Sequence, residues 1–142
     1  MVNLKQAIAL AVEAHHDQVD KAGAPYILHP LRVMFMMVGE VAQTVAVLHD
    51  VVEDSSMTFN KLQELGFSRE ITSALDALTH REGESYDQYI GRVAVHPLAR
   101  LIKIADLEDN MDIRRIAEPG EHDFLRWKKY RRAWALLTAT AG

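Results

Sequence analysis

The apolar residues of this chain recur with the period of an α-helix, and this pattern is the strongest constraint on its fold. Near the N-terminus an apolar residue returns every three or four positions, at Leu4, Ala7, Ile8, Ala11 and Val12. This spacing places them on one face of a helix. No segment shows the alternation of apolar and polar residues that is typical of a half-buried strand. The pattern therefore predicts an all-α protein.

Capping residues and prolines divide the chain into about eight helices. Ser68 and Ser85 are N-cap residues, and Gln88 completes a capping box with Ser85. Pro97 suits the first turn of the following helix. We expect Asp123 to cap the last helix. The expected helices cover about residues 4–19, 30–38, 41–52, 59–66, 69–78, 86–95, 98–109 and 124–137.

The length and composition favour one soluble domain. The 142 residues are enough to bury a core in a single domain, spanning residues 1–142. The absence of Cys excludes disulfides, thiolate zinc sites and Cys nucleophiles. A net charge of -4 argues against nonspecific binding to nucleic acid or to anionic membranes. The N-terminus has no signal-peptide pattern and no apolar run approaches a membrane span, so we expect a cytoplasmic protein.

The segment LHDVVED, residues 48–54, follows an apolar stretch with four ionisable residues: His49, Asp50, Glu53 and Asp54. On a continuous helix their side chains fall within an arc of about 140°. Burying so many ionisable groups without partners is costly, so a divalent cation or an open cleft is expected beside them. The alternative is a polar helix end that faces solvent.

Two other stretches place polar residues among apolar ones. In PYILHP, residues 25–30, His29 stands at the start of a helix, where its backbone direction is fixed. In LIKIADLEDN, residues 101–110, a cation, a carboxylate and an amide share one helix face, at Lys103, Asp106 and Asn110. The alternatives are a hydrogen-bonded packing histidine and an exposed, salt-bridged stripe, with Asp109 and Asp112 as further solvated acids.

Together these stretches predict a metal site. Its candidate ligands are His29, His49, Asp50 and Asp106. Two imidazoles and two carboxylates suit a six-coordinate first-row divalent ion, and manganese, iron and zinc are all possible. Such an ion holds a phosphate and lowers the pKa of a bound water. Glu53 and Asp54, one turn further, are placed to orient or deprotonate that water.

The order and spacing of these motifs resemble a known family. The pattern YIxHP…HDxxED…KxADxxxN, from about residue 4 to residue 116, resembles the hydrolase domain of the RelA/SpoT alarmone enzymes and their stand-alone small relatives, within the HD superfamily of metal-dependent phosphohydrolases. A lone His-Asp pair is weak evidence. His122-Asp123 is a second such pair, without the following Glu-Asp, and we interpret it as a helix cap.

The resemblance implies an all-helical HD domain with a central metal site that removes pyrophosphate from the 3′ position of a guanosine polyphosphate, (p)ppGpp, in the stringent response. By position, the ligands of Mn²⁺ are His29, His49, Asp50 and Asp106, and the catalytic acid/base pair is Glu53 and Asp54. The implied substrate contacts are Lys21 and Lys103 at phosphates and Asn110 near the ribose. The implied partner is therefore a small nucleotide, with no nucleic acid or membrane, and the oligomeric state stays open.

The chain departs from the family pattern near the expected base pocket. Asp20 stands where relatives usually carry a basic residue over the guanine ring, so adenosine as well as guanosine polyphosphates are candidate substrates. Two alternatives stay open: an HD enzyme for another phosphate ester, such as a nucleoside monophosphate, and a non-catalytic nucleotide-binding module. Glu53 and Asp54 count against the module, which has little need of them.

Overall fold

The computed structural model describes residues 2–139, which form helices without a β-sheet in that range. Most connections are short, but a long loop over residues 15–27 joins the first two helices. The elements are α1 (Leu4–Ala14), α2 (Leu28–Phe35), α3 (Glu40–Leu48), α4 (Val51–Asp54), α5 (Phe59–Glu64), α6 (Arg69–Leu78), α7 (Tyr86–Ala94), α8 (Pro97–Asn110), the 3₁₀ turn η1 (Ile113–Arg115) and α9 (Glu121–Ala139). The expectation of an all-α fold is confirmed.

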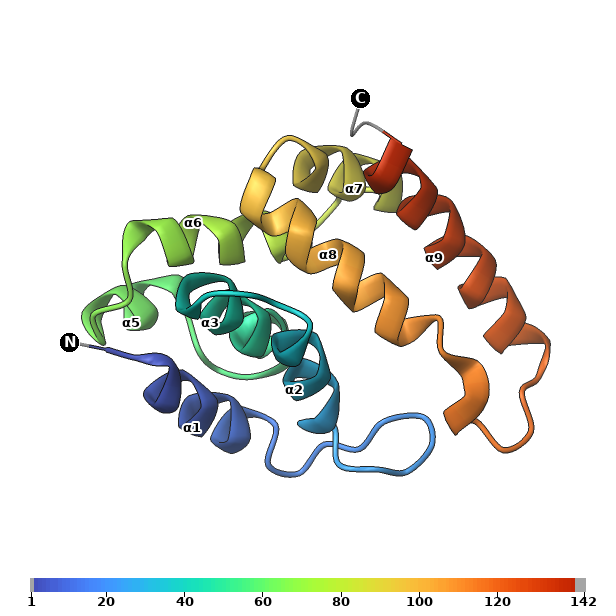
Figure 1. Cartoon of the computed structure of the whole chain (residues 1–142), viewed down its shortest axis with the longest axis horizontal. Coiled ribbons are helices and arrows are strands. Elements are labelled where there is room, and N and C mark those ends of the chain that lie inside the picture. The colour runs from blue at the N-terminus through green and yellow to red at the C-terminus, as the bar shows by residue number, and fades with distance from the viewer. Residues whose placement is uncertain (1, 140–142) are drawn as a thin grey trace.

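Helices α3 and α8 lie at the centre of the bundle (Figure 1). Helix α3 packs against α1, α2 and α6, and α8 packs against α2, α6, α7 and α9. The side chains of residues 45–48 in α3 are fully buried, as are Ile102 and Leu107 of α8. These two helices therefore form a rigid base from which polar side chains at their ends can be positioned.

Most of the expected helix starts are confirmed. Ser68 accepts the N–H of Ile71, and Ser85 forms the predicted capping box with Gln88. Pro97 opens α8. These caps satisfy N–H groups that have no partner within the helix, so they determine where the helices begin.

The first two helices are shorter than expected. Helix α1 ends at Ala14 rather than near residue 19, because His15 caps it and the His15 ring bonds to Gln18 in the following turn. Helix α2 begins at Leu28 and ends at Phe35 rather than at residue 38. Gly39, with φ of +95°, serves as the N-cap of α3.

The predicted continuous helix over residues 41–52 is wrong, because it is interrupted at His49 and Asp50. The carbonyl of Ala46 accepts both the backbone N–H of His49 and the Nδ1–H of its ring, at 3.4 and 2.6 Å. In a continuous helix this carbonyl would accept the N–H of Asp50. The ring of His49 therefore takes that acceptor, and the chain turns before α4.

The expected cap of the last helix is also different. Helix α9 begins at Glu121, so Asp123 lies in its first turn, where Oδ2 accepts the N–H of Gly120 at 2.8 Å. Between residues 2 and 139, no helix has both the length and the apolar character that a membrane crossing requires.

Candidate metal centre and its two cavities

Four side chains from three segments converge at the centre of the molecule. His29 comes from the first turn of α2, His49 and Asp50 from the turn between α3 and α4, and Asp106 from α8. Oδ1 of Asp106 lies 2.8 Å from Nε2 of His29 and 3.3 Å from Nε2 of His49. Oδ2 of Asp50 lies 3.7 and 3.1 Å from the same two nitrogens. The structure thus brings the four predicted ligands together.

The chemistry of this cluster fits a divalent ion. A carbonyl oxygen can only accept, so the bond from His49 to Ala46 places a hydrogen on Nδ1 and leaves Nε2 for a ligand. Donor atoms of His29, His49 and Asp50 all lie within 4.8 Å of one another. With Asp106 they form a largely buried set of nitrogen and oxygen donors, of the kind that first-row divalent ions bind.

Lys103 and Asn110 complete the surroundings of Asp106. Nζ of Lys103 donates to Oδ2 at 2.8 Å, and Nδ2 of Asn110 donates to Oδ1 at 3.0 Å. Burial opposes ionisation of Asp106, but Lys103 and the His49 imidazole hold the pKa of its carboxyl well below the usual value. Two of the three residues expected to contact substrate, Lys103 and Asn110, therefore also contact a candidate metal ligand.

Glu53 and Asp54 lie in α4 and line one cavity with His49 and Asp50. The predicted continuous helix is wrong, but these four polar residues still face the same space. Oε1 of Glu53 accepts the N–H of His80 at 2.6 Å, which attaches α4 to the loop after α6. Partial burial of its carboxyl group and the nearby Asp50 carboxylate raise the pKa of Asp54.

Tyr26 is a polar member of the site that the sequence did not reveal. Its hydroxyl donates to Oδ2 of Asp50 at 2.6 Å, and its ring lies against the rings of His15 and His29. In the motif PYILHP it stands among apolar residues, and nothing in one sequence separates a buried packing tyrosine from one that holds a carboxylate.

Asp109 was a solvated acid in the alternative interpretation of its stretch, and the structure contradicts that alternative. Its side chain is only 4% exposed, and Oδ2 accepts the Nδ1–H of His29 at 2.6 Å. Arg32 donates from Nε to Oδ1 at 2.7 Å and from Nη2 to Oδ2 at 3.0 Å. These contacts join residues about eighty positions apart, which local sequence periodicity cannot indicate.

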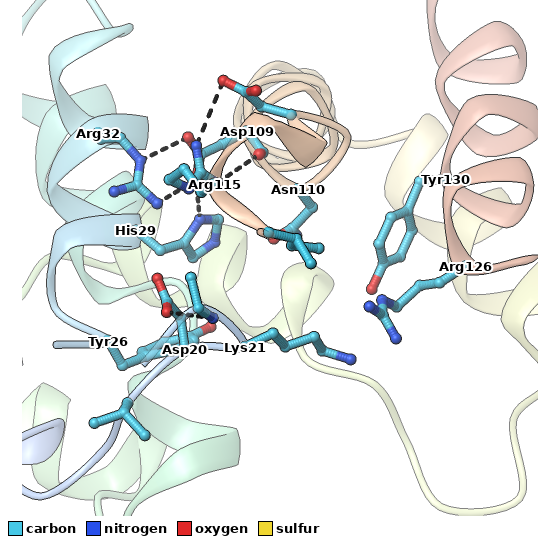
Figure 2. Close-up of a pocket in the computed structure, with 14 residues that line it drawn as sticks. Asp20, Lys21, Tyr26, His29, Arg32, Asp109, Asn110, Arg115, Arg126 and Tyr130 are labelled. Atoms are coloured by element: carbon cyan, nitrogen blue, oxygen red, sulfur yellow. Dashed lines mark hydrogen bonds and ion pairs between the residues drawn. The ribbon is translucent and has the colours of Figure 1, made fainter. Parts of the chain in front are cut away.

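Two adjoining cavities open beside the cluster. The metal-site cavity, of about 320 Å³, is lined by Tyr26, His49, Asp50, Glu53, Asp54, His80, Tyr86, Tyr89, Lys103, Asp106, Asn110, Lys129 and Tyr130. The loop cavity, of about 300 Å³, is lined by Val19, Asp20, Lys21, Ala22, Tyr26, His29, Arg32, Asp109, Asn110, Asp112, Arg115, Ile116, Arg126 and Tyr130 (Figure 2). Because Tyr26, Asn110 and Tyr130 line both, one extended ligand can occupy the two cavities.

Lys21 lies on the wall of the loop cavity. Its ammonium group and the guanidinium of Arg126 point toward each other across that cavity (Figure 2). Partial burial and the neighbouring Arg126 lower the pKa of Lys21. Two cations held near each other on a cavity wall favour an anionic ligand.

Asp20 organises the loop that carries Lys21. Its Oδ1 accepts the N–H groups of Ala22 and Ala24, each at 2.9 Å. Gly23 has φ of +85°, which glycine adopts without the strain of a Cβ, and its N–H donates to the carbonyl of Asp20 at 3.0 Å. The side-chain oxygen of Asp20 is therefore engaged within the loop itself.

Comparison with known proteins finds relatives named pyrophosphohydrolases and others named GTP pyrophosphokinases. No protein-family model matches the chain. The chain is 40% identical over 80 residues to a guanosine-3′,5′-bis(diphosphate) 3′-pyrophosphohydrolase of Spiroplasma citri, covering 54% of this chain and 10% of the relative. It is 30% identical over 120 residues to the enzyme of that name from Aquifex aeolicus (76% and 17%). It is 32% identical over 123 residues to the bifunctional (p)ppGpp synthase/hydrolase SpoT of Escherichia coli (76% and 17%).

The solved structures include a close match in fold. A metazoan ortholog of SpoT that hydrolyzes ppGpp superposes with a TM-score of 0.80 at 22% sequence identity, over 96% of this chain and 86% of the other. The chain spans only 10–17% of the length of the three curated relatives named above. The resemblance predicted from the motifs is confirmed: the chain is homologous to part of the SpoT/RelA-type pyrophosphohydrolases and has the fold of a SpoT ortholog.

Proposed function

We propose that this chain is a divalent-metal-dependent hydrolase that removes pyrophosphate from the 3′ position of a guanosine or adenosine polyphosphate. The observation that carries the proposal is the convergence of His29, His49, Asp50 and Asp106. The last three line one cavity together with Glu53 and Asp54. The names of the three curated relatives described above and of the matching structure support the same reaction.

The four ligands would hold the ion, for which we propose Mn²⁺. When bound, the ion supplies positive charge that binds a phosphate oxygen and lowers the pKa of a water ligand. Glu53 and Asp54 accept or return the proton of the attacking water. The raised pKa of Asp54 suits this task, because a general acid or base works best when its pKa approaches the working pH.

The remaining predicted residues bind the nucleotide in this proposal. Lys103, beside Asp106, neutralises the transferred pyrophosphate, and Asn110 meets the ribose where the two cavities join. Lys21 faces the loop cavity and binds a further phosphate. A nucleotide that follows this path places its 3′-pyrophosphate in the metal-site cavity and the rest of the molecule in the loop cavity.

The base end is where we expect this chain to differ from its relatives. Asp20 stands where a stacking cation is expected, and its Oδ1 is used by the loop. A lost cation–π contact costs about 0.5–2 kcal/mol, or roughly 2- to 30-fold in affinity. We therefore propose weak or altered selectivity for guanine. We also propose that residues 1–142 act as one cytoplasmic domain.

A substrate screen tests this proposal. The purified chain, stripped of metal and reloaded with Mn²⁺, is incubated with guanosine and adenosine 3′,5′-bis(diphosphates) and with nucleoside monophosphates. Both the nucleotide product and pyrophosphate are measured, and Asp50→Ala serves as the inactive control. We expect pyrophosphate release from the 3′-diphosphates only. Turnover of monophosphates alone would assign another phosphate ester as substrate, and Mn²⁺-independent activity would contradict the metal centre.

A further inference from the structure

The two imidazoles of the metal centre are oriented by groups of different kinds. Nδ1 of His49 donates to a backbone carbonyl, that of Ala46, at 2.6 Å. Nδ1 of His29 donates to a side-chain carboxylate, that of Asp109, also at 2.6 Å. The first arrangement is part of the α3 backbone and no substitution of a side chain removes its acceptor. The second depends entirely on the residue at position 109.

Asp109 is itself held in place. Arg32 of α2 donates two hydrogen bonds to the carboxylate, one to each oxygen, at 2.7 and 3.0 Å. Nη2 of Arg115 donates to the backbone carbonyl of Asp109 at 3.0 Å and lies 3.6 Å from Oδ2 (Figure 2). Although burial opposes ionisation, the hydrogen bonds from His29 and Arg32 lower the pKa of Asp109 to about 2. Because the Arg32 guanidinium donates to both of its oxygens, the group that meets His29 is an ionised carboxylate.

We infer that Asp109 is a positioning residue of the metal centre: it fixes the ring of His29 with Nδ1 protonated and Nε2 directed at Asp50 and Asp106. This inference rests on the proposed metal-dependent function. A carboxylate that accepts from the distal nitrogen of a metal-bound histidine fixes its tautomer and raises its basicity as a ligand. Asp109 does not touch the metal position itself, because its contact with His29 is on the opposite side of the ring.

The test compares Asp109→Asn and Asp109→Ala with the parent chain. The Asn variant keeps an oxygen that can accept from Nδ1 but removes the charge, while the Ala variant removes both. Glu108→Gln is the matched control, since Glu108 is an exposed acid on the same helix that accepts from Trp134 and not from His29. Mn²⁺ affinity is measured by calorimetry on the metal-free full chain, and thermal unfolding of the same samples checks that each variant is folded.

We expect the Mn²⁺ dissociation constant to rise by about 10- to 100-fold in Asp109→Ala. Asp109→Asn should lie between Ala and the parent, and Glu108→Gln should match the parent. If Asp109→Ala does not fold, the Asn variant decides. Unchanged Mn²⁺ affinity in folded Asp109 variants would overturn the inference, even if their melting temperatures fell. A parent chain that binds no divalent ion would instead overturn the metal centre.

A second measurement separates positioning from a purely structural role. In the metal-free chain, the protected Nδ1 protons of His29 and His49 should both give downfield proton resonances. Asp109→Ala should remove the His29 resonance and leave that of His49, which serves as an internal control because it bonds to Ala46. Persistence of both resonances, or loss of both, would contradict the assigned role of Asp109.

Discussion

The buried ion pair between Lys103 and Asp106 leads to a prediction in which the stability of the metal-free chain and its Mn²⁺ affinity respond differently to substitution. Their side chains are 11% and 6% exposed, and Nζ lies 2.8 Å from Oδ2. Asp106→Asn preserves the shape of the side chain but leaves Lys103 buried without its counter-charge. The metal-free chain should therefore be less stable, although it loses no apolar contact.

The expected loss is about 3 kcal/mol. Removing one partner of a buried ion pair costs about 3–5 kcal/mol. The lower value applies because the substitution also relieves repulsion between Asp106 and Asp50, and because Lys103 borders a cavity. With about 2–4 °C per kcal/mol for a domain of this size, the melting temperature should fall by roughly 6–12 °C.

Replacing both partners should restore most of the stability that Asp106→Asn loses. Well-packed apolar or neutral replacements for both members of a buried pair are often neutral in stability. We therefore expect Lys103→Met/Asp106→Asn to recover most of the loss, with a coupling energy of about 1–3 kcal/mol in the double-mutant cycle. Neither Asp106→Asn nor the double variant should regain Mn²⁺ affinity, since both lack a ligand.

The assay is urea unfolding of the metal-free parent, the two single variants and the double variant in the presence of a chelator, with Mn²⁺ binding measured separately. Additivity of the two single effects within about 0.5 kcal/mol would show that the pair is not coupled and refute the reasoning. Full Mn²⁺ affinity in the double variant would remove Asp106 from the ligand set.

Three further predictions concern the rest of the site and the loop beside it. Glu53→Gln/Asp54→Asn should lower kcat by about 100-fold or more with Mn²⁺ affinity retained; full activity, or loss of metal in Glu53→Gln alone, would contradict their assignment. Tyr26→Phe should weaken Mn²⁺ binding several-fold in calorimetry, because Asp50 loses the hydrogen bond that holds it. An affinity equal to that of the parent chain would show that Tyr26 serves only in packing. The hydrogen bonds of Arg92 lower the pKa of Glu84 from 4.5 to about 2, so this carboxylate stabilises the fold above about pH 4.5 and its contribution is lost as the pH falls toward 2. The difference in melting temperature between the parent and Glu84→Gln should shrink over that range; a constant difference would show that the pair is not linked to folding.

The convergence of the four candidate ligands could be predicted because the sequence signal at each of them is local. An ionisable residue in an apolar helical segment is unusual at each of the three sites, and His29, His49, Asp50 and Asp106 all follow from that rule. The helix starts at Ser68, Ser85 and Pro97 were predictable for the same reason, because a helix cap is recognised from three or four neighbouring residues.

What could not be predicted depends on tertiary partners. The break after α3 arises because the His49 ring takes the carbonyl of Ala46, and helical periodicity contains no information about that competition. Asp109 resembles any exposed acid until α2 brings His29 and Arg32 against it. Asp20 was interpreted from the sequence as part of the base pocket, whereas its side-chain oxygen accepts backbone hydrogen bonds within its own loop.

The most direct test of the proposed reaction is product analysis with guanosine 3′,5′-bis(diphosphate) and Mn²⁺. The proposal predicts intact pyrophosphate and guanosine 5′-diphosphate in equal amounts, with no product after chelation or in His49→Ala. Release of single phosphates, or cleavage at the 5′ position, would contradict a 3′-pyrophosphohydrolase.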